Sequence, residues 1–214
     1  MNKWLVAAMM LAPMQAFAAC SAEDPVEDDK NQVLSGETKT LIAYFSAEGH
    51  TRALAEEIKE ETGADIFFIE PAVSYASNPY DDSDKIQNEA YNDLRPEVKS
   101  YVEEERMAQY DTIFVGTPIW WHQPAMVVCT FLEHYDLKDK VVIPFVTFGA
   151  RSYFNETMQK IYKCTPDSEH IPARLPEDLD PDNIRQPQND DDGIDVATSG
   201  HVREWLKRIG YGEN

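Results

Sequence analysis

Short apolar runs alternate with longer amphipathic segments through most of the chain. Four of these runs predict β-strands, at residues 40–45, 65–69, 111–115 and 140–146. Their apolar residues are consecutive and do not alternate with polar ones, which is typical of parallel strands buried on both faces. A fifth, shorter strand is predicted at 169–175, where Pro172 limits hydrogen bonding and favours the edge of a sheet.

The amphipathic segments predict helices. Along 51–62, Leu54 and Ile58 share an apolar face with charged residues opposite, and Gly63 suits the C-terminal cap. Further helices are predicted at residues 96–107, 124–134, 152–163 and 202–209. The stretch from 72 to 94, rich in Asn, Asp and Tyr, is predicted to be a long polar connection.

Strands that alternate with helices in this way predict an α/β fold with a doubly wound, five-stranded parallel sheet. Ligands of such sheets bind at the carboxyl ends of the strands, where the strand order reverses. The loops that follow residues 45, 115 and 146 are therefore the candidate site.

Composition excludes some partners. The 214 residues suit one domain with a tail, and 39 acidic against 19 basic residues give a formal net charge of −20. This charge argues against nucleic-acid binding and against electrostatic adsorption to anionic lipid. It is compatible with simple solubility and also with docking to a basic partner.

The first residues indicate export. Lys3 precedes a short apolar run, so residues 1–19 are predicted to be a secretory signal rather than a membrane span. Small residues at Ala16 and Ala18 suit ordinary cleavage, whereas the stretch from Phe17 to Cys20 resembles a bacterial lipobox, in which Cys20 becomes the lipidated first residue.

The acidic residues that follow Cys20 resemble the export tag of surface lipoproteins in some Gram-negative bacteria. We expect a cell-envelope protein whose membrane attachment is through a lipid anchor alone. Residues 20–39 would then be a flexible acidic tether and residues 40–214 the folded domain.

Two further cysteines lie inside the domain. Cys129 falls in an apolar run and is predicted to be a packed core thiol, and Cys164 lies near a predicted helix end. The sequence leaves open whether the two pair. There is no Cys-x-x-Cys motif, which disfavours a dithiol redox site.

The segment 176–195 is strongly acidic. Asp178, Asp180 and Asp182 alternate as in a calcium loop, but Asn183 and Asn189 occupy the positions that such a loop gives to Gly and Glu. We therefore interpret the segment as a solvated loop and predict no metal site there.

The loop at residues 46–51 joins a predicted strand to a predicted helix, which makes it an anion site. Ser46, His50 and Thr51 offer side-chain donors, and Gly49 permits close approach of the backbone. Neither a G-x-G-x-x-G nor a P-loop motif is present, so the anion predicted is a phosphate monoester. The alternative is that Thr51 only caps its helix.

The second and third loops carry aromatic residues. Trp120 and Trp121 are adjacent after a buried strand, and we expect one to pack in the core and the other to stack on a large planar ligand. His122 could donate a hydrogen bond or be an ordinary loop residue. The third loop, at 147–152, offers backbone N–H groups, a hydroxyl and a phenyl ring, or is simply a turn that Ser152 caps.

With these loops the chain resembles the flavodoxin family from about residue 40 to residue 210. The stretches that carry the resemblance are Tyr44-Phe-Ser-Ala-Glu-Gly-His-Thr51, Gly116-Thr-Pro-Ile-Trp-Trp121, Pro144-Phe-Val-Thr-Phe-Gly149 and Trp205-Leu-Lys-Arg-Ile-Gly210. The resemblance implies the strand order 2-1-3-4-5 and FMN as cofactor. Two departures are Glu48, where members usually have Thr or Ser, and Ala150, which replaces a frequent second glycine.

The resemblance also implies the residues that bind the cofactor. On the phosphate side these are Ser46, Glu48, Gly49, His50, Thr51 and Arg52. Those that flank the isoalloxazine are Pro118, Ile119, Trp120, Trp121, Thr147, Phe148 and Gly149.

The function expected is that of an FMN-binding electron-transfer protein or small flavin reductase at the cell envelope. Its partners would be redox proteins or a quinone-like acceptor. The sequence contains no paired nucleophile and base of the kind that hydrolysis requires. The alternative is a binding module of the envelope that keeps the fold without the cofactor. Glu48 and the acidic segment 176–195 favour that alternative, and the retained tryptophan pair with Ser46 and Thr51 disfavours it.

Overall fold

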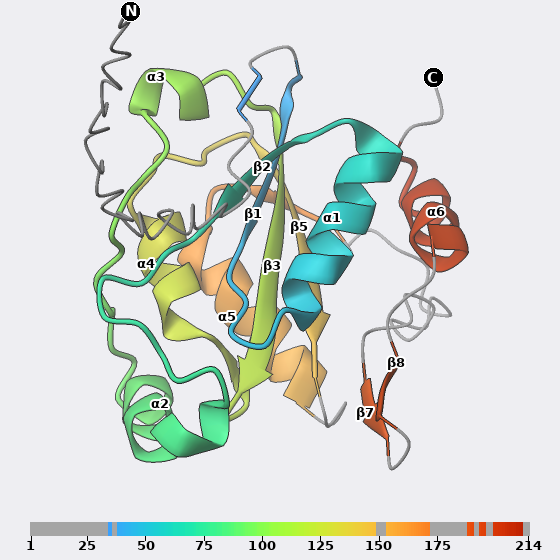
Figure 1. Cartoon of the computed structure of the whole chain (residues 1–214). Helices are drawn as coiled ribbons and strands as arrows, with labels where there is room; N and C mark the ends of the chain where they lie inside the picture. The colour runs from blue at the N-terminus through green and yellow to red at the C-terminus, as the bar shows by residue number, and fades with distance from the viewer. Residues whose placement is uncertain are drawn as a thin grey trace, which may run out of the picture.

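A parallel sheet runs through the centre of the molecule in the order β2-β1-β3-β5-β6 (Figure 1). The computed structural model describes residues 34–35, 38–148, 153–171, 188–190, 193–195 and 199–211. The strands of the sheet are β1 Thr40–Tyr44, β2 Asp65–Phe68, β3 Thr112–Trp120, β5 Val141–Thr147 and β6 Glu169–His170, and β4 Gln123–Pro124 pairs with β3. This order confirms the predicted arrangement, and β6 confirms the predicted edge strand.

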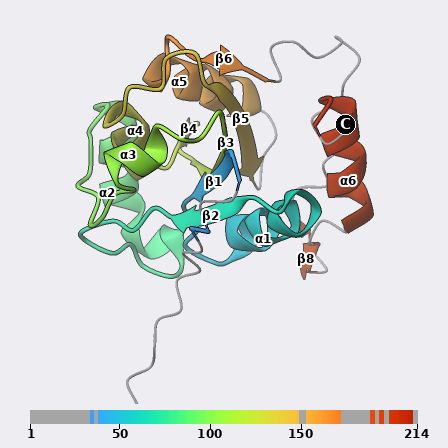
Figure 2. The same ribbon diagram turned by 90° about the horizontal axis from the view of Figure 1, so that it is seen from above.

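The helices are α1 His50–Thr62, α2 Ser83–Tyr91, α3 Glu104–Met107, α4 Met126–Glu133, α5 Phe154–Cys164 and α6 Ser199–Arg208. Helices cover both faces of the sheet because the central strands bury side chains on both. Along β1, Leu41 and Ala43 belong to the core under α4 and α5, whereas Ile42 and Tyr44 belong to the core under α1 and α6. Viewed from above, these two helix pairs lie on opposite sides of the sheet (Figure 2).

The prediction of a helix at residues 96–107 is wrong over most of that range, because only Glu104–Met107 is helical. Val98 instead forms an antiparallel bridge with Pro71, and the Lys99 N–H donates to the Glu70 carbonyl at 2.7 Å. This extended backbone buries Val98 and Val102 in the core. Their spacing of four residues has the appearance of a helical face, which explains the error.

The predicted polar connection 72–94 was also wrong, because it contains the 3₁₀ helix η1 Pro79–Asp82 and then α2. The Asn78 side chain accepts a hydrogen bond from the Tyr80 N–H, and Pro79 occupies the first turn. An Asn-Pro pair of this kind is a helix-start signal.

β3 is longer than predicted and carries part of the second loop as strand. It continues to Trp120, turns at Trp121 and His122, and returns as β4. Gly116 lies between Tyr44 and Phe145, and a Cβ atom there would come within 2.3 Å of the Phe145 ring. Only glycine therefore lets β3 pass between its two neighbours at this point.

The described residues just before β1 lie against the fold: the Lys39 carbonyl accepts a hydrogen bond from the Thr112 N–H of β3, and Ser35 bonds to Asp65 of β2. The backbone N–H and hydroxyl of Ser35 both donate to Asp65 Oδ1, at 2.8 and 2.7 Å, and Tyr110 donates to Asp65 Oδ2 at 2.6 Å. The last part of the predicted tether thus lies against the edge of β2. Asp65 is buried, and these donors satisfy its carboxylate.

Several predictions fall outside the described residues: the leader, Cys20, Gly149, Ser152, the strand positions 172–175 and the calcium-like positions 178–183. Within the acidic segment, β7 Gln188–Asp190 and β8 Gly193–Asp195 form an antiparallel pair. None of the helices in the described ranges is both long enough and apolar enough to span a membrane.

Candidate functional site

A cleft of about 810 Å³ opens where β1, β3 and β5 end. These strand ends lie at the lower edge of the sheet in Figure 1. It brings together all three loops that the sequence singled out. The predicted residues that line it are Ser46, Glu48, His50, Thr51, Pro118, Ile119, Trp120, Trp121, Thr147 and Phe148. Its volume lies in the range of small-molecule and cofactor sites.

The N-terminus of α1 faces this cleft without a side-chain cap. Gly49 is the N-cap residue, with a φ of 92°, and nothing lies within 4 Å of where its Cβ would be. The first turn of α1 carries no acidic residue, so the first N–H groups and the positive end of the helix dipole remain open to an anion.

Two side chains complete this end of the cleft. The Ser46 hydroxyl oxygen accepts a hydrogen bond from the Gly49 N–H at 3.1 Å, which shapes the loop. The His50 ring nitrogen Nε2 is buried and has no hydrogen-bond partner among the described residues. A buried polar atom without a partner is costly, so its position at the cleft makes this nitrogen a candidate contact for a ligand.

Thr51 does not act as a helix cap. Its side chain is buried, and its hydroxyl lies 2.8 Å from that of Thr147 at the end of β5. Because this bond joins the first loop to the third, it fixes the distance between the two walls of the cleft.

The two tryptophans have different surroundings, one packed among aromatic rings and the other partly exposed. Trp120 packs edge-on against Phe45 and Tyr75, with ring centroids 5.3 and 5.2 Å away. Trp121 is 37% exposed and contacts only the edge of Tyr91 among the aromatic rings of the described residues. Trp120 is therefore the anchored member of the pair and Trp121 the one available to a ligand.

Trp121 and His122 make a strained turn. Their φ values are 48° and 67°, in the left-handed region that bulky residues avoid, and they form the tip of the β3–β4 hairpin. Such strain is often found at functional sites. The His122 ring stacks on Tyr153, with centroids 3.6 Å apart, and Tyr153 also lines the cleft.

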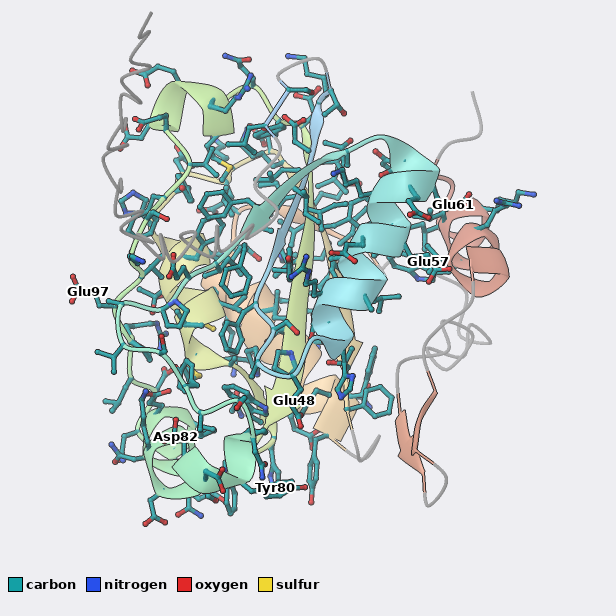
Figure 3. All side chains as sticks on the ribbon, viewed as in Figure 1. Glu48, Glu57, Glu61, Tyr80, Asp82 and Glu97 are labelled. Atoms are coloured by element: carbon teal, nitrogen blue, oxygen red, sulfur yellow. The ribbon has the colours of Figure 1, made fainter. Side chains whose placement is uncertain are left out.

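The structure adds a wall that sequence reasoning missed. Pro79, Tyr80, Ser83 and Ile86, from η1 and α2, line the cleft opposite α1. Figure 3 shows Tyr80 on the same side of the molecule as Glu48. The Asn-Pro helix start and the apolar Ile86 are the signals that could have revealed this wall.

A partly buried hydrogen bond supports that wall from behind. The Tyr75 hydroxyl donates to Glu89 Oε2 at 2.7 Å, which ties the segment before η1 to α2. Burial raises the pKa of the Glu89 carboxyl, and the Tyr75 hydrogen bond opposes that rise. Since Tyr75 also contacts Trp120, the missed wall and the hairpin form one packed unit.

Four of the predicted residues lie differently from the rest. Glu48 is exposed at the rim, so its carboxylate is solvated. Arg52 does not line the cleft and forms an ion pair with Glu56 at 2.7 Å. Gly49 is not among the residues that line the cleft, and Gly149 is outside the described residues. Over the described part of the chain, no three or more His, Cys, Asp or Glu residues are grouped to hold a metal ion.

Comparisons with known proteins agree with this geometry. A family model described as Flavodoxin matches residues 39–185, which is more than half of the chain. No curated protein matches the sequence.

Solved structures also match. A candidate flavoprotein from Bacteroides eggerthii is 28% identical, with 80% of this chain and 97% of that chain covered and a TM-score of 0.58. A second, from Bacteroides uniformis, is 26% identical, with 78% and 97% covered and a TM-score of 0.60. The complex of a Lactobacillus acidophilus flavoprotein with FMN shares the fold at 23% identity, with 62% and 89% covered and a TM-score of 0.54.

Proposed function

The chain belongs to the flavodoxin family, and from that premise we propose that its cleft binds FMN for electron transfer. The observation that carries the proposal is the arrangement of an uncapped helix N-terminus and the unpartnered His50 Nε2 at one end of the cleft and two tryptophans at the other. A phosphate and a flat ring are the two chemical groups that these ends suit.

The residues present fit this cofactor. The first N–H groups of α1 and His50 would hold the phosphate, and Gly49 leaves room for it because its Cβ position is empty. Trp121 would cover one part of the ring, while Trp120 stays fixed by Phe45 and Tyr75. Glu48 does not oppose the phosphate, since its side chain is solvated at the rim.

When bound, FMN supplies redox chemistry that side chains alone cannot perform. The chain positions the ring, excludes water from the end that Trp120 and Ile119 line, and surrounds the site with the field of a strongly acidic protein. Negative charge nearby disfavours the gain of electrons, so we expect a low reduction potential.

The test is the visible spectrum of the purified protein, as isolated and after addition of FMN. Bound flavin that remains after gel filtration supports the proposal. A colourless protein that retains no FMN would contradict the proposal and favour the alternative of a cofactor-free binding module. Oxidation of NAD(P)H in the presence of a quinone would identify a reductase, and its absence together with bound FMN would identify a carrier that serves a redox protein.

We also propose that the protein is exported to the cell envelope and anchored there by a lipid on Cys20. The sequence from Lys3 to Cys20 supports this, because its apolar run precedes a lipobox-like stretch. Expressed with its own leader, the wild-type chain should fractionate with membranes and Cys20→Ser should not. Equal distribution of both proteins would refute the anchor.

A further inference from the structure

Two thiols from different helices touch in the core. Cys129 lies within α4 and Cys164 is the last residue of α5, and their Sγ atoms are 2.7 Å apart although 35 residues separate them. Both are free thiols in the structure, and they are 0% and 5% exposed. The contact exists because α4 and α5 pack side by side on the same face of the sheet.

We propose that Cys129 and Cys164 form a structural disulfide when the chain folds in the presence of an oxidant. The two thiols lose two protons and two electrons to an external disulfide such as oxidised glutathione, which is released as two thiols. One S–S bond forms inside the protein and one breaks in the oxidant. The proposal goes beyond flavin binding and does not rest on it.

The surroundings of the pair determine when the bond can form. The hydrogen bond with Cys129 and burial raise the pKa of the Cys164 thiol, and the nearby Glu133 carboxylate adds to that rise. The reactive thiolate is therefore scarce once the core has closed. We infer that oxidation takes place during folding and that the finished disulfide is shielded from reductants.

The bond would also act on the cleft. α4 continues from the hairpin that carries Trp121 and His122, and α5 begins directly after Tyr153. A covalent link between these helices would hold together the two elements that meet in the stack of His122 on Tyr153.

The experiment is to unfold and reduce the full chain and then to refold it in a glutathione redox buffer or in reductant. Remaining thiols are alkylated in denaturant, and peptides are mapped by mass spectrometry. We expect a peptide cross-linked through Cys129 and Cys164 from the redox buffer, which dithiothreitol opens only after denaturation. Alkylated Cys129 and Cys164 from the redox buffer, or a bond to Cys20, would overturn the proposal.

Thermal unfolding provides the second measurement. The oxidised form should unfold about 5–10 °C above the reduced form. Cys20→Ala should keep this difference, whereas Cys129→Ala and Cys164→Ala should lose it. Equal midpoints for the oxidised and reduced wild type would show that the bond has no structural role, and peptide mapping of the wild type decides the pairing even if a variant does not fold.

Discussion

The hydroxyl oxygens of Thr51 and Thr147 lie 2.8 Å apart and join the start of α1 to the end of β5 across 96 residues of sequence. Both side chains are buried, so each hydroxyl would lack a partner if the other were removed. The pair therefore holds the start of α1 and the end of β5 at a set distance on the rim of the cleft.

A double-mutant cycle tests this coupling. Thr51→Val and Thr147→Val should each lower the free energy of unfolding by about 1–3 kcal/mol, because each leaves one buried hydroxyl unpaired. The double variant should lose less than the sum, with a coupling of about 1 kcal/mol by urea unfolding. Thr51→Val with Thr130→Val, whose hydroxyl bonds within α4, should be additive. Additive losses for Thr51 and Thr147 would contradict the bond.

His50 should contribute to FMN affinity rather than to stability. Because His50 Nε2 is buried without a hydrogen-bond partner among the described residues, its removal should not lower the unfolding free energy. Loss of its bond to a charged phosphate should weaken FMN binding by roughly 10- to 100-fold in His50→Ala. His134→Ala is the matched control, because His134 is exposed and stacks on Tyr101. Equal affinities for the two variants would place the phosphate elsewhere.

The two tryptophans should separate stability from binding. Trp120→Leu should lower the free energy of unfolding by about 2–4 kcal/mol, because Trp120 packs on Phe45 and Tyr75. Trp121→Asn should leave stability unchanged or raise it by about 1 kcal/mol, since Asn tolerates positive φ. It should nevertheless weaken FMN binding. Chemical denaturation gives the stability of both variants, and flavin titration gives their FMN affinity. A larger loss of stability in Trp121→Asn than in Trp120→Leu would contradict the assignment of Trp120 as the anchored residue.

Glu57 should make stability depend on pH. It lies on α1 near α6 (Figure 3), and burial, with the neighbouring Glu60 and Glu61 carboxylates, raises its pKa to about 7. Between the unfolded value of 4.5 and about 7, the folded state binds more protons than the unfolded state. Stability should therefore fall as pH rises through this range and then level off.

Glu57→Gln should remove that decline and be more stable than wild type at pH 8, by about 1 kcal/mol after allowance for solvent screening. Unfolding free energies measured from pH 5 to pH 8 give the comparison. Glu97→Gln, which removes an exposed carboxylate away from α6, should keep the wild-type decline. A decline in Glu57→Gln equal to that of wild type would show that another group is responsible.

The sheet and the three loops could be predicted because consecutive apolar residues identify parallel strands, whose carboxyl ends meet at one edge. The errors arose where long-range pairing overrides local pattern. Val98 and Val102 have helical spacing, yet the bridge from Val98 to Pro71 keeps them extended. The wall that carries Tyr80 was missed because α2 is mostly polar and depends on the bond from Tyr75 to Glu89, which no local pattern reveals.

The most direct test of the account is a titration of the purified protein with FMN and with riboflavin, which differ only by the phosphate. We expect saturable binding of FMN with quenching of its fluorescence, and riboflavin binding weaker by at least about tenfold. Equal affinity for the two would contradict a phosphate held by α1 and His50. Binding of neither would contradict the assignment of the cleft to a flavin.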